Sequence, residues 1–279
     1  MIEPTTEIFN VLIEAGKAIV DIYGSKDFEA KLKSDNTPVT LADKASSKIV
    51  NSGLKKLFAD ISIIDEENRI PDYAERKTWT SYFLLDPLDG TKEFINRNGE
   101  FCINLALIEN SNAVEGWIYE PLRKRGWYCK KGKGVFEFDV NGNFRKIKIP
   151  QKLDDTIRIV TSRSFFKSLE ASLIKEIEKK YPVEIIHRGS SLKQVDIILG
   201  NADMYLKAGP CSEWDTAPGQ LMIEEFGGNV FRQDNFETMS YNKPILLNPH
   251  FIMLNANLNT PDFVSFLKII IKNTQTICG

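Results

Sequence analysis

The sequence predicts a mixed fold in which an α+β first half is followed by an α/β second half. Two observations carry this prediction. Between residues 101 and 149, short segments of alternating polar and apolar residues are separated by glycine turns, which is typical of antiparallel strands. After residue 157, β-branched segments alternate with helical ones, as in an α/β layer. We therefore expect an N-terminal α+β subdomain, residues 1–153, and a C-terminal α/β subdomain, residues 154–279, that together form one unit.

Composition and charge favour a small-molecule partner. The 279 residues include 36 basic and 38 acidic side chains, so the net charge is close to neutral and no positive field attracts nucleic acid. The four cysteines, at positions 102, 129, 211 and 278, show neither close pairing nor a companion histidine cluster. This spacing argues against a zinc site, and we expect free thiols.

Neither a secretory signal nor a bilayer span is predicted. The first seven residues contain no basic region, and the most apolar late segment, residues 263–271, is short and includes Lys268. We therefore expect a cytoplasmic protein, either free or peripheral at the inner face of the membrane. An oligomer is compatible with this sequence.

Two amphipathic helices are predicted near the start of the chain. Residues 7–23 carry apolar side chains at three- or four-residue intervals before Gly24. A polar loop over residues 31–39 leads to a second helix that ends near Phe58. Thr40 or Asp43 is suited to cap this second helix, and a catalytic role for Asp43 is the alternative.

Acidic residues end two predicted strands. The first strand, residues 61–64, runs into Asp65-Glu66-Glu67, which is either a solvated turn, the reading that local evidence favours, or a place where a cation relieves repulsion. The second, beginning at Ser81, ends in Asp86-Pro87-Leu88-Asp89-Gly90-Thr91. Carboxylates beside a glycine-led helix start suit metal-assisted phosphate chemistry, although aspartate, proline and glycine are also ordinary turn residues.

An antiparallel meander is expected after a short helix near residues 92–97. Its predicted strands are residues 101–109, 113–119, 125–130, 135–140 and 144–149. Asn141-Gly142 predicts a two-residue hairpin turn between the last two.

The second half of the chain is predicted to alternate strands with helices. Strands are expected at residues 157–161, 183–187 and 203–206, with a helix near 166–181. The turn Gly189-Ser190-Ser191 opens a helix that runs to about Leu199, and its serines serve either as an N-cap or as anion ligands.

A further helix is expected to begin near Asp215 and to end at Gly227-Gly228. Asp215 is an ordinary N-terminal cap residue by position, and Pro218 is tolerable if it lies in the first turn. We find no chemistry in residues 229–271, which are expected to form short strands and a last helix. The two histidines, His187 and His250, share no motif with a serine or cysteine, so a hydrolytic triad is not expected.

Four segments, taken in order, resemble one known family. They are Pro38-Val39-Thr40 with Asp43, Asp65-Glu66-Glu67, Asp86-Pro87-Leu88-Asp89-Gly90-Thr91, and Trp214-Asp215-Thr216-Ala217. This order resembles the lithium-sensitive, Mg²⁺-dependent phosphatases of the inositol monophosphatase superfamily, from the first helix to Gly228. The resemblance implies a layered αβαβα sandwich of the inositol monophosphatase and sugar phosphatase type.

Additional segments resemble one subgroup. Four segments look most like the 3'(2'),5'-bisphosphate nucleotidases of the CysQ type: Lys92-Glu93-Phe94, residues 98–101, the turn at residues 189–193, and Glu213-Trp214-Asp215-Thr216. Such enzymes remove the 3'-phosphate of adenosine 3',5'-bisphosphate, giving AMP and phosphate, and clear this by-product of sulfate assimilation. The alternative is an inositol monophosphatase or sugar phosphatase on the same scaffold.

Two other classes of phosphate-handling protein fit these acidic residues less well. In the haloacid dehalogenase type, one residue separates the two aspartates after the strand, whereas two residues separate Asp86 from Asp89. A non-catalytic phosphate-binding module has little use for four acids together with a Thr91 and Asp43 pair. We therefore expect hydrolysis without an aspartyl phosphate.

The resemblance implies roles for individual residues. Two or three Mg²⁺ ions would be held by oxygen atoms of Glu66, Asp86, Leu88 (its backbone carbonyl), Asp89 and Asp215. The implied catalytic residues are Glu66 and the Thr91 and Asp43 pair, which would help to deprotonate a metal-activated water. The implied substrate-binding residues are Glu66, Leu88, Asp89, Gly90, Thr91, Ser190, Lys193, Lys207 and Asp215.

Three positions depart from the pattern of this family. Asp65 stands where serine is common, so it either adds negative charge near the metals or points outward. Lys207 stands where an arginine is frequent, which removes bidentate recognition of a phosphate. Pro218 stands where alanine is usual.

Overall fold

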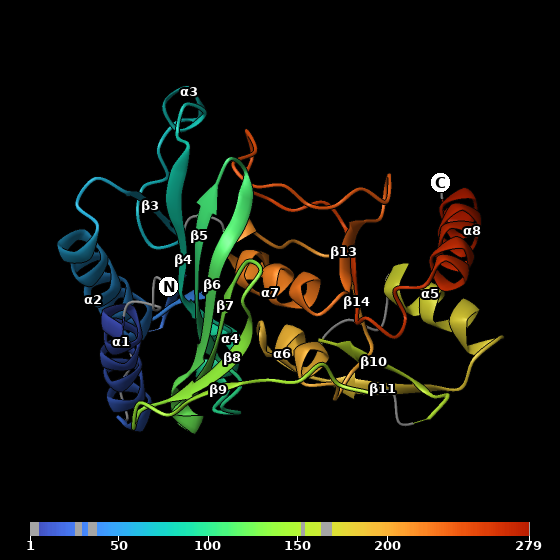
Figure 1. Ribbon diagram of the computed structural model, residues 1–279, viewed down its shortest axis with the longest axis horizontal. Helices are drawn as coiled ribbons and strands as arrows, with labels where there is room; N and C mark the ends of the chain where they lie inside the picture. Colours follow the sequence, from blue (N-terminus) through green and yellow to red (C-terminus); the bar gives the residue numbers. More distant parts are fainter. Residues whose placement is uncertain (1–5, 26–29, 33–37, 152–153, 163–168, 279) are drawn as a thin grey trace.

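The computed structural model describes residues 6–25, 30–32, 38–151, 154–162 and 169–278. Its elements form five layers, helix, sheet, helix, sheet and helix, which follow one another from left to right in Figure 1. Three hydrophobic clusters fill the space between these layers. The predicted αβαβα sandwich is therefore confirmed.

The first sheet has seven strands in the order β3-β4-β5-β6-β7-β8-β9. β3 and β4 are parallel, and every later neighbour is antiparallel. The strands are β3 (Ser62–Asp65), β4 (Ser81–Asp89), β5 (Cys102–Glu109), β6 (Asn112–Glu120), β7 (Arg125–Lys130), β8 (Gly134–Asp139) and β9 (Phe144–Lys146). The meander predicted from the alternating residues is confirmed.

Helices α1 (Thr6–Gly24) and α2 (Leu41–Leu57) cover the outer face of this sheet. Their apolar sides pack together with strands of the sheet in one cluster. The two helices approach closely at Gly53, because a Cβ atom there would lie 2.4 Å from a methyl group of Val11. This contact packs α2, which carries Asp43, directly against α1.

The middle layer consists of α6 (Leu192–Ile198) and α7 (Glu213–Glu225), which lie between the two sheets (Figure 1). β4 is buried along almost its whole length because α2 lies on one side of the first sheet and α7 on the other. This burial explains its continuous apolar sequence. Asp86 therefore lies in the interior of the molecule.

The second sheet has five strands in the order β11-β10-β12-β14-β13. They are β10 (Ile157–Thr161), β11 (Val183–His187), β12 (Met204–Lys207), β13 (Asn229–Arg232) and β14 (Phe251–Leu254). α5 (Leu169–Glu178) and α8 (Pro261–Cys278) cover its outer face. The α/β second half is confirmed, although the subdomain boundary near residues 153 and 154 stays a prediction.

Several short elements complete the chain. They are β1 (Lys31–Leu32), β2 (Pro38–Val39), α3 (Tyr73–Arg76), α4 (Thr91–Ile95) and the 3₁₀ helix η1 (Pro121–Arg123). Part of the polar loop before Pro38 and the start of the helix predicted from residue 166 lie outside the described residues. Within the described part of the chain, none of the helices combines the length and the apolar character that a membrane span requires.

Two local predictions are wrong. β8 and β9 are joined through residues 140–143 rather than by a two-residue turn, because the Asp139 carboxylate accepts from the backbone N–H groups of Asn141 and Asn143. Pro218 does not lie in the first turn of its helix, which begins at Glu213. It occupies the second turn, where its Cα would lie 2.8 Å from a Cβ at Gly116, so glycine in β6 makes room for it.

Candidate active site

Three acids that are distant in the sequence converge where the first sheet meets α7. Glu66 follows β3, Asp86 lies in β4, and Asp215 lies in the first turn of α7. One carboxylate oxygen from each lies within 4.8 Å of the others. An all-oxygen group of this kind could hold a hard metal ion.

The charges of this acidic group oppose one another. Burial, followed by the charges of Asp89 and Glu66, raises the pKa of Asp215 to about 7. Burial also raises the pKa of Asp86 well above its ordinary value, followed by the effects of Glu66 and Asp89. A cation would offset both the cost of burying these ionised carboxylates and the repulsion between them. The residues present therefore fit a metal ion.

The end of β4 is shaped to turn its acids inward. The pairing with β5 shifts register between Asp86 and Asp89, because Pro87 cannot donate to the ladder. The Asp86 carboxylate then accepts from the Leu88 N–H at 3.0 Å. The Leu88 carbonyl oxygen lies 3.3 Å from the Thr91 hydroxyl oxygen. The bulge thereby places side-chain and backbone oxygens at one turn.

Thr91 and Asp43 are in direct contact. The Thr91 hydroxyl donates to Asp43 Oδ1 at 3.0 Å, while Oδ2 accepts from the Thr40 N–H at 2.7 Å and the Thr40 hydroxyl at 2.6 Å. Thr40 is also the N-cap of α2, and Asp43 completes its capping box. The structure therefore shows that Asp43 caps the helix and also holds Thr91.

Gly90 is required by the turn that follows β4. Its φ is +99°, in the left-handed region, and a Cβ there would lie 2.8 Å from the backbone oxygen of Glu100. Any side chain would therefore displace the backbone that links Asp89 to Thr91.

A polar bridge joins Asp89 to Asp215. Asp89 Oδ2 accepts from the Ser191 N–H and from the Asn104 amide, the latter at 3.2 Å. The Ser191 hydroxyl donates to the backbone oxygen of Asp215 at 2.8 Å, and the Gln194 amide donates to the same oxygen at 2.5 Å. Ser191 occupies the N-cap position of α6 but makes no side-chain cap bond. Its hydroxyl instead accepts from the Asn104 amide at 2.8 Å and so links β5 to the first turn of α7.

The predicted substrate-binding residues Ser190, Lys193 and Lys207 lie beside this bridge. Ser190 has a φ of +51°, and its hydroxyl accepts from the Leu192 N–H at 3.2 Å. The buried Lys193 ammonium donates to the Ser190 carbonyl at 2.7 Å. Burial lowers the pKa of Lys193, and the charge of nearby Lys207 lowers it further, whereas that of Asp89 raises it. Positive charge therefore lies close to the acidic group.

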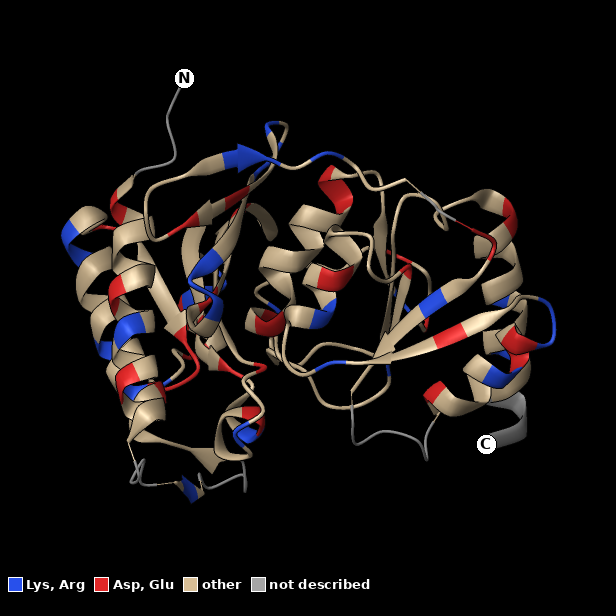
Figure 2. Ribbon diagram, turned by 90° about the horizontal axis from the view of Figure 1, so that it is seen from below, with Lys and Arg blue, Asp and Glu red and all other residues tan. Residues whose placement is uncertain are grey.

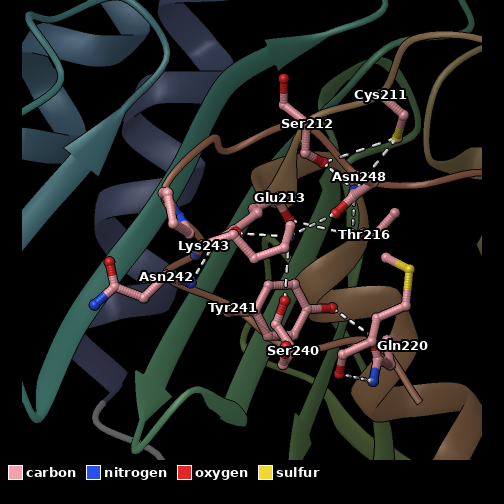
Figure 3. Close-up of polar contacts among 12 residues, drawn as sticks. Cys211, Ser212, Glu213, Thr216, Gln220, Ser240, Tyr241, Asn242, Lys243 and Asn248 are labelled. Atoms are coloured by element: carbon pink, nitrogen blue, oxygen red, sulfur yellow. Dashed lines mark hydrogen bonds and ion pairs between the residues drawn. The ribbon is translucent and has the colours of Figure 1, made fainter. Parts of the chain in front are cut away.

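A segment that had been predicted to hold no chemistry supports α7. Residues 240–248, here called the α7 strap, run past the N-terminal end of this helix (Figure 3). The fully buried Glu213 accepts from the Asn242 N–H at 2.7 Å and from the Lys243 ammonium at 2.6 Å. Asn248 donates from its amide to the Ser212 carbonyl at 2.6 Å. Since the Ser212 N–H donates to Asp215, the α7 strap holds the backbone that presents this acid.

The acidic group lies in a molecule whose charges are otherwise mixed. Figure 2 shows basic and acidic residues interspersed over both halves of the chain, in keeping with the net charge of −2. Local geometry rather than an overall field therefore determines what the site attracts.

The sequence of this chain matches one known protein family. The model of the inositol monophosphatase family matches residues 1–258 of the 279. The chain belongs to the inositol monophosphatase family. Members of the inositol monophosphatase family generally depend on a metal ion, in agreement with an acidic group that could bind one.

Curated relatives within the inositol monophosphatase family cover most of the chain. The protein named 3'(2'),5'-bisphosphate nucleotidase CysQ from Haemophilus influenzae is 32% identical over 250 residues, which are 89% of this chain and 91% of that protein. The protein of the same name from Salmonella typhimurium is 37% identical over 239 residues, 85% of this chain and 94% of its own length.

Solved structures of the inositol monophosphatase family share the architecture. CysQ from Bacteroides thetaiotaomicron has a TM-score of 0.80 and 33% identity, and the match covers 90% of this chain and 96% of that one. An IMPase of Thermotoga maritima, 21% identical with a TM-score of 0.73 over 95% of this chain and 96% of its own, shows the same fold.

Sequence reasoning missed several residues that support this inositol monophosphatase site. Asn104, Gln194 and Asn248 make hydrogen bonds around Asp89 and Asp215 but belong to no motif that the sequence displays, and Glu213 stands in a motif without a predicted role. A polar Asn104 within an otherwise apolar strand was the one available signal. The solvated turn expected at Asp65 is also wrong, because this residue is only 2% exposed.

Proposed function

We propose that this protein is a Mg²⁺-dependent phosphomonoesterase that hydrolyses the 3'-phosphate of adenosine 3',5'-bisphosphate to give AMP and phosphate. The observation that carries the proposal is the convergence of Glu66, Asp86 and Asp215 within 4.8 Å. The Thr91 and Asp43 pair lies at the turn that follows Asp86. The names of relatives that match most of the chain support the nucleotide as substrate.

The proposed metal ligands are the oxygens of Glu66, Asp86, Leu88, Asp89 and Asp215, which would hold two or three ions. Both the Ser191 and the Asn104 donors reach Oδ2 of Asp89, so its Oδ1 is the oxygen assigned to the metal. Bound Mg²⁺ would supply an activated water and would offset charge on the phosphoryl oxygens.

Thr91 and Asp43 would move the proton of the attacking water. The Thr91 hydroxyl donates to Asp43, so its oxygen lone pairs face away from that bond and can accept a proton. Burial raises the pKa of Asp43, which makes the carboxylate a stronger base than an exposed aspartate. The Thr40 donors hold Asp43 in the required orientation. Glu66 would act beside them as a metal ligand that also faces the water.

The remaining proposed residues would hold the substrate. The N–H groups of Gly90 and Thr91 would bind the phosphate that is removed. Ser190 and Lys193, together with Lys207, would hold the other phosphate or the ribose, and each lysine would act as a point charge rather than a bidentate fork.

A panel of substrates tests this proposal. Phosphate release from adenosine 3',5'-bisphosphate is compared with release from inositol 1-phosphate and fructose 1,6-bisphosphate, each with and without Mg²⁺. We expect the nucleotide to have the highest kcat/KM and all activity to require the metal ion. If the nucleotide were the poorest of the three, an inositol phosphatase or sugar phosphatase on the same scaffold would replace this proposal. The cytoplasmic location and an oligomeric state stay predictions from the sequence.

A further inference from the structure

Asp65 is a buried carboxylate with four hydrogen-bond donors. Its Oδ2 accepts from the Ser47 hydroxyl at 2.5 Å, the Asn51 amide at 2.5 Å and the Asn68 amide at 2.7 Å. Its Oδ1 accepts from the Glu67 N–H at 2.8 Å. Burial of an ionised carboxylate is tolerable only when donors replace its water in this way.

These contacts leave Asp65 no part in metal binding. Three donors crowd one oxygen, and the backbone of its own turn occupies the other. Ser47 and Asn51 belong to α2, so the carboxylate faces this helix. Of the two alternatives that the sequence left open, pointing outward is wrong, because Asp65 is only 2% exposed. Its carboxylate does lie next to Glu66 in the chain, but its hydrogen bonds go to α2 and to its own turn.

The buried polar face of α2 contacts both segments of the first sheet that carry acids of the candidate site, the turn after β3 and the end of β4. Asp43 accepts from Thr91 after β4, and Ser46 donates to the Pro87 carbonyl at 2.7 Å within the β4 bulge. Ser47 donates to Asp65, directly before Glu66. Each contact falls on the same side of one rigid helix, which therefore sets the spacing between these loops.

The backbone of Glu66 is held on both sides. Its N–H donates to the Leu85 carbonyl at 3.2 Å, and the next N–H, that of Glu67, donates to the Asp65 carboxylate. The Asn68 N–H donates to the Asp65 carbonyl at 3.1 Å, which closes the turn. The position of the Glu66 side chain therefore depends on the place where Asp65 anchors this turn.

We propose that Asp65 is a positioning residue, which fixes the Glu66 carboxylate at the metal site by anchoring its turn to Ser47 and Asn51 of α2. The inference rests on the proposed role of Glu66 as a metal ligand. A serine at this position offers one oxygen in place of two, and it cannot engage all four donors in the same way.

Metal binding without substrate tests the anchor. The shift in melting temperature is measured as Mg²⁺ is added to the protein in the absence of any phosphate ester, and the concentration that gives half of the shift is recorded. Asp65→Asn keeps the shape of the side chain but replaces one accepting oxygen with an amide NH₂ group, which cannot accept from the donors around it. Asn51→Leu removes one donor without changing the charge. Asp60→Asn is the control. Asp60 is an exposed acid in a groove of about 790 Å³ between α2 and the start of β3, which Ser47 and Asn51 also line.

We expect the half-shift concentration to rise about tenfold in Asp65→Asn and by a smaller factor in Asn51→Leu, as is usual when groups behind a metal ligand are lost. Asp60→Asn should stay within about twofold of the parent, because it touches no ligand. The maximal rate at saturating Mg²⁺ should fall less than the metal affinity does.

Unchanged half-shift concentrations in both Asp65→Asn and Asn51→Leu would overturn the anchor and leave Asp65 a purely structural group. If Asp65→Asn does not unfold cooperatively, Asn51→Leu decides alone. A parent protein whose melting temperature does not respond to Mg²⁺ would refute the proposed function and the anchor together. The two failures are therefore distinguishable, whatever the substrate is.

Discussion

The Thr91 hydroxyl lies 3.0 Å from Asp43 Oδ1 and joins the turn after β4 to the first turn of α2. The same aspartate accepts two hydrogen bonds from Thr40 at the helix N-terminus. The capping box thus gives the carboxylate a fixed orientation before any substrate arrives. A group with fixed geometry loses little entropy in the transition state, which suits a proton acceptor.

Replacement of Thr91 by valine should abolish turnover without unfolding the protein. Valine keeps the shape of threonine but cannot relay a proton to Asp43, and loss of general base assistance costs about 10²- to 10⁴-fold in rate. Thr91→Ser, the matched control, retains the hydroxyl and most of the rate. The measurements are kcat and melting temperature. Near-normal turnover by Thr91→Val would contradict the proposed relay.

The stability of the Asp43→Asn variant relative to the parent protein should increase as the pH rises. Burial raises the pKa of Asp43 above its ordinary 3.8, so the folded chain binds this proton more tightly than the unfolded chain does. The stability this gives is fully present below the unfolded pKa and is lost as the pH rises through the raised folded pKa. The amide does not titrate.

The difference in melting temperature between Asp43→Asn and the parent, followed from about pH 4 to about pH 7, should therefore increase. The same substitution should lose activity throughout, because an amide cannot accept the proton. A difference that stayed flat with pH would show that Asp43 does not titrate in this range.

Removal of divalent metal should destabilise the parent but not an Asp86→Asn variant. Without a cation, Asp86 is buried beside Glu66 and Asp89, and this like-charge repulsion opposes folding. Asn at this position relieves the repulsion and also removes a ligand. We therefore expect EDTA to lower the melting temperature of the parent, and neither EDTA nor added Mg²⁺ to change that of Asp86→Asn appreciably. An equal response of the two proteins to Mg²⁺ would argue against Asp86 as a ligand.

The sequence could predict the acids of the site but not the groups behind them. Glu66 and Asp86 lie at or near the ends of neighbouring parallel strands, and Asp215 lies in the first turn of a helix, so the order of elements already brings them to one edge. The hydrogen bonds of Asp65 and Glu213 depend on segments that meet only in the folded chain. The local sequence favoured a solvated turn at Asp65 because runs of acidic residues usually face water. In the folded chain, α2 instead supplies buried donors to its carboxylate.

Helix boundaries were predictable only where the capping residues were recognised. Thr40 was one of the two residues expected to cap α2, and α2 begins directly after it. α7 begins earlier than its aspartate suggested, because Ser212 is its N-cap and Asp215 is the third helical residue. This offset of a few residues moved Pro218 from a harmless first-turn position into the helix interior, where its fit depends on Gly116 in another element.

Lys243→Met should weaken folding through the α7 strap. The Lys243 ammonium lies 2.6 Å from Glu213, whose side chain is fully buried while the lysine is 22% exposed. The Glu213 carboxylate now accepts from three donors, and loss of the ammonium leaves only two, the backbone N–H groups of Asn242 and Lys243. Losing a hydrogen bond to a buried charged group costs about 1.5–3 kcal/mol.

Lys179→Met is the matched control, because Lys179 also lies 2.6 Å from its acid, Glu176, but both side chains are exposed. Exposed pairs are screened by water, so this control should barely change the free energy of unfolding in urea. Combining Lys243→Met with Glu213→Gln should cost less than the sum of the single effects, since the amide no longer needs a cation. Equal destabilisation by Lys243→Met and Lys179→Met would mean that the α7 strap does not depend on this ion pair.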